Sequence, residues 1–141
     1  MPFYCHDVTP RGLRVPIDDA TTKHQCGAVG VRGITIIVGT QAGLDELKGI
    51  YVELFGGEGS VDGDEVVFEA CRVENVQGLE GGARVVLRLA KGDEVEKVGE
   101  KGFWFGDVVL AAKANGGKEV GTKERIDAGG EGVGGLWVEY V

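Results

Sequence analysis

Only one stretch of the chain spaces its hydrophobic residues as a helix does. From Leu44 to Phe55 the apolar side chains follow one another at steps of three and four, which predicts a helix with one buried face. Thr40 suits the cap before this helix, and Gly56 suits its left-handed end. Because a single helix cannot enclose a core by itself, most of the remaining core must come from a sheet.

The other apolar segments are rich in β-branched residues or alternate with a period of two, as strands do. They predict five strands, with a bulge at Gly106-Asp107 in the fourth. The glycine-rich, charged residues 113–135 predict a long loop, and residues 1–30, which hold all three prolines and both histidines, predict an extended arm before a domain at 31–141. The five predicted strands are 31–38, 65–73, 84–89, 103–112 and 136–141.

This order of elements predicts an α+β fold with a mostly antiparallel, curved sheet and one main helix on one face. The opposite face of the sheet then needs a cover of its own. Either the sheet curls on itself or a second copy of the chain supplies the missing layer. We expect a two-fold symmetric homodimer, because an apolar sheet face would otherwise exceed what monomers leave exposed.

Charge and motifs exclude several classes of function. The net charge is −8 and no Lys/Arg cluster occurs, which argues against nucleic acid and anionic membranes as partners. No apolar run is long enough to span a membrane, and the N-terminal residues lack the apolar stretch of a secretory signal, so we expect a cytoplasmic protein. No phosphate-binding or dinucleotide motif occurs. Cys5, Cys26 and Cys71 have no metal-site spacing and are expected to be reduced thiols.

Three segments carry a resemblance to a known family. They are residues 3–16 (FYCHDVTPRGLRVP), residues 24–30 (HQCGAVG) and residues 135–139 (GLWVE). With the strand–helix–strands order, they resemble the vicinal oxygen chelate superfamily, which has the glyoxalase-like fold. The chain looks like a C-terminal module of that family standing alone. The resemblance implies a βαβββ module whose substrate cup is completed by dimerisation.

The same resemblance bears on metal binding. In that family a His or Gln near the start of the first strand and a Glu near the end of the last strand bind the metal. The first position falls at residues 33–35, which hold no strong ligand, and the second falls at Glu139. His6 or His24 could approach from the arm, but two carboxylates in a dimer fall short of the usual ligand number. We therefore expect neither a metal nor another cofactor.

Four residues are candidates for proton transfer: His24, Glu69, Asp107 and Glu139. A histidine titrates near neutral pH, and a carboxylate buried in a pocket has a raised pKa that suits it to the same task. Each residue also has an ordinary interpretation, as a loop histidine or as a carboxylate in water.

Seven further residues are candidates for substrate contact. Arg84 and Arg88 share one face of a predicted strand, where they could hold a carboxylate or an enolate, or simply cover the outer face of the sheet. The aromatic candidates could line a hydrophobic pocket or pack in the core. They are Phe103, Trp104, Phe105, Trp137 and Tyr140.

The first functional hypothesis is a cofactor-independent cyclase, isomerase or lyase. It would act on a small hydrophobic oxygenated metabolite, of polyketide or terpenoid type, by substrate positioning and general acid–base catalysis. One alternative is a non-catalytic protein of the same fold that binds or sequesters a small molecule. The other is a metal-dependent enzyme of glyoxalase or dioxygenase type.

Overall fold

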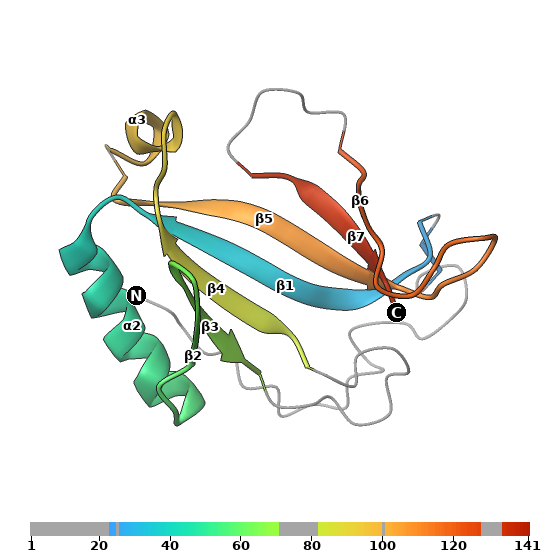
Figure 1. The fold of residues 1–141 in the computed structure, drawn as a ribbon, viewed down its shortest axis with the longest axis horizontal. Coiled ribbons are helices and arrows are strands. Elements are labelled where there is room, and N and C mark those ends of the chain that lie inside the picture. Colours follow the sequence, from blue (N-terminus) through green and yellow to red (C-terminus); the bar gives the residue numbers. More distant parts are fainter. Residues whose placement is uncertain (1–22, 25, 71–81, 100, 128–133) are drawn as a thin grey trace, which may run out of the picture.

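A computed structural model of the protein describes residues 23–24, 26–70, 82–99, 101–127 and 134–141. Within these residues, a curved, open sheet of seven strands carries two helices (Figure 1). The helices are α2 (Gln41–Phe55) and α3 (Glu94–Gly99). The strands are β1 (Ala28–Val38), β2 (Ser60–Asp62), β3 (Glu65–Glu69), β4 (Arg84–Leu89), β5 (Phe103–Ala112), β6 (Lys123–Arg125) and β7 (Leu136–Tyr140).

The strand order β2-β3-β4-β1-β5-β7-β6 has an approximate two-fold repeat. In one half β1 runs parallel to β4, which pairs antiparallel with β3. In the other half β5 runs parallel to β7, which pairs antiparallel with β6. The halves meet where β1 and β5 pair antiparallel. The fold is therefore of the α+β class with a mostly antiparallel sheet, as predicted, but the sheet has more strands than the sequence indicated.

The helix α2 has the ends that the sequence predicted. The hydroxyl of Thr40 accepts a hydrogen bond from the amide of Gly43 at 3.1 Å, which satisfies a donor of the first turn. Gly56 ends the helix in the left-handed conformation, with φ of 70°, and its amide donates to the carbonyl of Val52.

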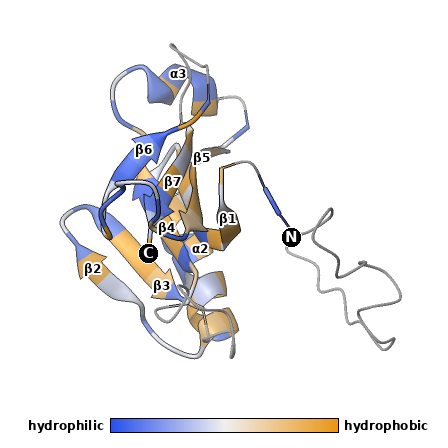
Figure 2. Cartoon of the chain, turned by 90° about the vertical axis from the view of Figure 1, so that its right-hand side faces the viewer, coloured by the Kyte–Doolittle hydropathy of each residue, from blue (hydrophilic) through white to orange (hydrophobic). Residues whose placement is uncertain are grey.

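The main core lies between α2 and the β1–β4–β3 half of the sheet. Leu44 of α2 packs on Ile36, Phe68 and Leu87, which are almost fully buried. Figure 2 shows the hydrophobic colouring concentrated in central strands such as β1 and β5, whereas β6 and much of α3 are hydrophilic. Within the described residues, α2 covers only one half of its side of the sheet, because its contacts are with β1, β3 and β4.

Several predicted boundaries were wrong. β1 begins at Ala28, inside the predicted arm, and the second predicted strand ends at Glu69, while residues 71–73 lie outside the described residues. The short elements β2, α3 and β6 were not predicted, and β6 lies within the predicted loop 113–135. β2 is exposed at all three positions, and α3 is too short to display a helical period, so neither has an alternating pattern to detect.

The predicted bulge in β5 is confirmed by the strand register. Ile34 pairs with Val108 and Ile36 with Phe105, so three steps along β5 match two along β1. The extra residue lies in the Gly106-Asp107 segment. A glycine suits this place, because a Cβ on Gly106 would lie 2.9 Å from the Cδ1 atom of Ile37.

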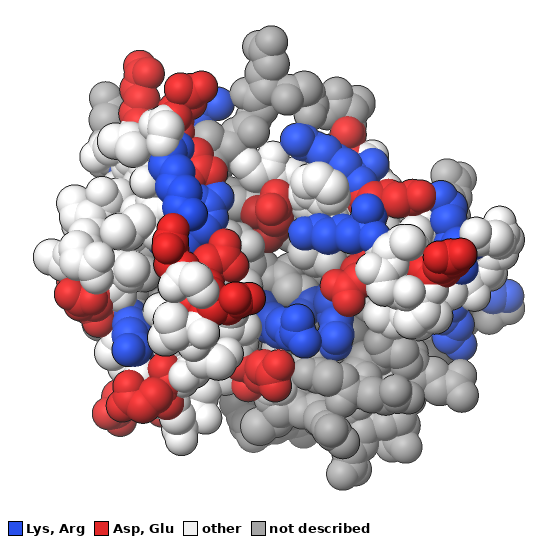
Figure 3. Space-filling view, in the orientation of Figure 1, with Lys and Arg blue, Asp and Glu red and all other residues white. Residues whose placement is uncertain are grey.

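Charged side chains of both signs lie close together on one face of the described residues. Figure 3 shows Lys and Arg side chains interspersed with Asp and Glu side chains across the visible face. Neither α2 nor α3 combines the length and the apolar run that a membrane-crossing helix needs.

Candidate functional site

Most of the candidate site residues identified from the sequence lie on the face of the sheet opposite α2. We call this face the charged face. Side chains alternate along a strand, so the register assigns them to faces. Arg84 and Arg88 pair with Gly33 and Ile37 of β1, whereas the intervening Leu87 belongs to the core under α2. The charged face comprises Glu65, Glu69, Arg84, Arg88, Trp104, Asp107, Trp137 and Glu139.

The three nominated carboxylates each have a partner on this face. Glu69 lies 3.5 Å from Arg84 and is largely exposed. Glu139 lies 3.7 Å from Arg32. Asp107 accepts a hydrogen bond from the indole of Trp137 at 2.7 Å. Each of these carboxylates is thus engaged by a cation or a hydrogen-bond donor of the protein itself, which suits a structural role.

Arg88 is held by the helix α3 and is not directed at a ligand. Its two terminal nitrogens donate to the two carboxylate oxygens of Glu94, at 2.6 Å each. Glu94 also accepts a hydrogen bond from the amide of Lys91. The hydrogen bonds from Arg88 lower the pKa of Glu94, and the same hydrogen bonds raise the pKa of Arg88. This bidentate pair fixes α3 over the end of β4.

Trp137 lies among cations at the other end of the charged face. The ammonium of Lys123 lies 4.8 Å from the centre of its ring, and the guanidinium of Arg125 lies 5.8 Å away. Arg125 donates twice to Asp127, which lowers the pKa of Asp127 to about 2. Asp127 also accepts a hydrogen bond from the amide of Leu136, so these contacts join β6 to β7.

His24 and Tyr140 do not belong to the charged face: His24 precedes β1, and alternation along β7 places Tyr140 on the opposite side of the sheet from Glu139. His24 is exposed in the turn before β1, where its carbonyl accepts a hydrogen bond from Gly27. Tyr140 donates from its hydroxyl to Glu124 at 3.1 Å, and burial raises its pKa. The structure therefore does not bring the four proton-transfer candidates into one site.

The aromatic segment of β5 is divided between the two faces. Phe103 and Phe105 pair with Val38 and Ile36 and lie on the α2 side of the sheet, while Trp104 lies on the charged face, where the ammonium of Lys101 sits 4.7 Å from its ring centre. Of these three aromatic residues, only Phe103 and Phe105 therefore share a face of the sheet.

Phe103 and Phe105 form one wall of a groove, which we call the α2–β5 groove. Its volume is about 420 Å³, within the usual range for small-molecule sites, roughly 300–1,000 Å³. Gly43, Gly102, Lys101 and the polar side chains of Glu46 and Tyr51 complete it. Its apolar lining consists of Ile36, Val38, Leu47, Ile50, Phe103 and Phe105.

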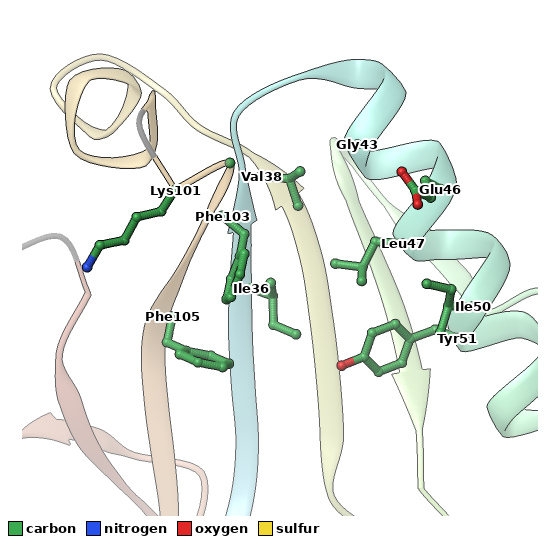
Figure 4. A pocket seen from close by; sticks show the side chains of 11 residues that line it. Ile36, Val38, Gly43, Glu46, Leu47, Ile50, Tyr51, Lys101, Phe103 and Phe105 are labelled. Carbon is green, nitrogen blue, oxygen red and sulfur yellow. The ribbon is translucent and has the colours of Figure 1, made fainter. Parts of the chain in front are cut away.

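The groove has a sheet floor and two opposed walls (Figure 4). Ile36 and Val38 lie between Phe105 and Phe103 on β5 and the side chains of α2. The hydroxyl of Tyr51 points from α2 across the floor toward the β5 side. Phe103 and Phe105 are 47% and 55% exposed, although phenyl side chains gain from burial.

The sequence offered a partial signal for this groove. Leu47 and Tyr51 belong to the predicted apolar face of the helix, and Phe103 and Phe105 were nominated as ligand contacts. What it could not show is that β5 lies beside β1 and brings its phenyl rings opposite α2. Lys101 and Glu46 were missed because isolated charged residues carry no pattern.

The described residues contain no cluster of three or more His, Cys, Asp or Glu side chains that could hold a metal ion. His6, which was considered as a ligand from the arm, lies outside the described residues, as do Cys5 and Cys71. Comparisons of the chain with family models, with curated proteins and with solved structures find no match.

Proposed function

We propose that this protein binds a small, mainly apolar, oxygen-bearing molecule in the α2–β5 groove. The observation that carries the proposal is the pairing of an apolar groove of about 420 Å³ with a few polar groups at its edge. Sites for small molecules combine these features, since apolar walls supply binding energy and isolated polar groups fix orientation. The functional class is that of the non-catalytic binding protein, one of the alternatives that the sequence left open.

Cofactor-independent isomerisation or cyclisation is the second candidate. The observation that favours it is that Glu46 and Tyr51 line the same groove, so that a carboxylate and a hydroxyl could exchange protons with one ligand. His24, Glu69, Asp107 and Glu139 do not line the groove. If the protein is an enzyme, we therefore propose Glu46 and Tyr51, and not those four residues, as its proton-transfer groups.

The fold proposal is that of a glyoxalase-like protein. Its support is the order β1-α2-β2-β3-β4, which is a strand–helix–three-strand unit, followed by β5, β6 and β7, which repeat part of that arrangement. The homodimer is also part of the proposal. Its support lies on the α2 side of the sheet, where Val31 and Leu136 are partly exposed beyond the groove, and not on the charged face, whose residues are already paired.

A titration with Nile red, an uncharged fluorescent probe, tests the binding proposal. Ile50 is 39% exposed and lines the groove, while Leu54 on the same helix is 38% exposed and does not. We expect the variant Ile50→Glu to weaken binding by about tenfold or more, because the probe would lie against an unpaired charge, and Leu54→Glu to bind as the parent does. The proposal fails if the parent does not bind the probe or if the two variants have equal affinities.

A further inference from the structure

The wall formed by Phe103 and Phe105 has a geometry that favours planar ligands. The two rings have centroids 5.6 Å apart and an interplanar angle of 85°. In such an edge-to-face pair the rings stand at right angles, so a flat molecule that stacks on one ring can meet the edge of the other. A flexible alkyl chain could cover the same area but would not use this geometry.

The opposite wall is held rigidly by an aromatic cluster. The ring of Tyr51 stacks on Phe55, with centroids 5.8 Å apart and an interplanar angle of 16°, and lies 5.6 Å from Phe68. Phe68 is 1% exposed and belongs to the core. Because Tyr51 is anchored in this way, its hydroxyl has a fixed direction across the groove floor (Figure 4). A hydroxyl both donates and accepts hydrogen bonds, so it suits a carbonyl or hydroxyl oxygen of a ligand.

The charges at the groove disfavour an ionised ligand. Glu46 is an exposed carboxylate that lines the groove and would repel an anion, while the ammonium of Lys101 lies over Trp104 on the charged face. Its floor consists of Ile36 and Val38, which are buried and apolar. A charged group placed over that floor would lose water without gaining a partner.

We infer that the ligand of the α2–β5 groove is a planar, uncharged molecule with an aromatic or conjugated body and a hydroxyl or carbonyl oxygen. The body lies against Phe103 and Phe105, and the oxygen faces the hydroxyl of Tyr51. This inference rests on the proposed function, since it specifies the chemical class of ligand for the same groove.

Isothermal titration calorimetry with three probes tests the inference. The probes are 2-naphthol, which is planar and neutral, 1-decanol, which is flexible and neutral, and 2-naphthoate, which is planar and anionic. We expect 2-naphthol to bind about tenfold more tightly than either of the others. In the variant Phe105→Leu, which keeps an apolar wall but removes the ring, we expect the preference of 2-naphthol over 1-decanol to fall to less than threefold. Leu54→Ala, a change on α2 outside the groove, should leave that preference unchanged.

The outcomes separate this inference from the function it rests on. If none of the three probes binds, the proposed function fails. If 1-decanol or 2-naphthoate binds as tightly as 2-naphthol, or if Phe105→Leu keeps the full preference, the groove binds small molecules but the ligand class is wrong. Amide resonances of residues 36 and 47 in NMR spectra should shift with 2-naphthol, and shifts confined to the charged face would overturn the inference as well.

Discussion

The bidentate ion pair between Arg88 and Glu94 is expected to stabilise the fold and, through α3, the β5 wall of the groove. The side chains are 17% and 19% exposed, so water screens them only in part. In the variant Glu94→Gln, one acceptor oxygen becomes an NH₂ donor that faces the guanidinium. A hydrogen bond to a charged group contributes about 1.5–3 kcal/mol. Arg88 keeps a second carboxylate nearby, because Glu65 lies 4.0 Å away, so the guanidinium is not left without a partner. We therefore expect the free energy of unfolding to fall by about 2 kcal/mol and the Tm to fall by roughly 7 °C.

The pH dependence gives this prediction a second check. The pKa of Glu94 is lowered below its ordinary value of 4.5 by its hydrogen bonds from Arg88. A carboxylate with a depressed folded-state pKa contributes stability that is present above its unfolded value and is lost as the pH falls through the folded value. In urea unfolding, the difference in free energy of unfolding between the parent and Glu94→Gln should therefore have its largest value at pH 7 and decrease below about pH 4.5. The control is Glu96→Gln on the exposed side of the same helix. Equal stability of the two variants at pH 7, or a difference that persists unchanged in acid, would refute the reasoning.

Four further predictions follow from the structure. Gly49→Ala should raise the free energy of unfolding by about 0.5–1 kcal/mol in urea melts, because nothing lies within 4 Å of a Cβ there and alanine favours the helix. Gly106→Ala should lower the free energy of unfolding by about 1–3 kcal/mol, since its Cβ would lie 2.9 Å from the Cδ1 atom of Ile37. An unchanged urea melt would contradict this, because it would mean that β5 shifts to make room for the methyl group. The carboxyl of Asp127 should titrate near pH 2 in NMR spectra, because Arg125 holds it ionised, and a midpoint near 3.8 would contradict this. Light scattering at micromolar concentration should give twice the mass of one chain, and the mass of a single chain would contradict the proposed homodimer.

The elements predicted from long periodic patterns are those that the structure confirms. Leu44 to Phe55 carried a helical period, and the caps at Thr40 and Gly56 follow from side-chain chemistry that acts within a few residues. The bulge at Gly106-Asp107 was also a local signal. Each of these depends on residues close together in the sequence, and therefore needs no knowledge of the tertiary fold.

The pairing of distant strands could not be predicted in this way. No repeat is visible in the sequence, yet β5, β7 and β6 repeat the arrangement of β1, β4 and β3. β6 consists of three residues, Lys-Glu-Arg, with no apolar alternation to reveal a strand. The candidate catalytic residues failed to converge for the same reason. Glu69 and Glu139 lie on β3 and β7, which three other strands separate in the sheet.

The position of the groove follows from an imbalance between strands and helices. The strands repeat about the β1–β5 pair, but α2 covers only the β1 half on its side of the sheet, and the other described helix, α3, is tied to the charged face through Arg88. The edge of α2 therefore faces β5 across a strip that neither of the described helices covers. Alternation then places Phe103 and Phe105 on that strip and sends Trp104 to the charged face. A shift of β5 by one residue would exchange the two sets of aromatics, so the same register that pairs Ile36 with Phe105 determines whether the groove exists at all.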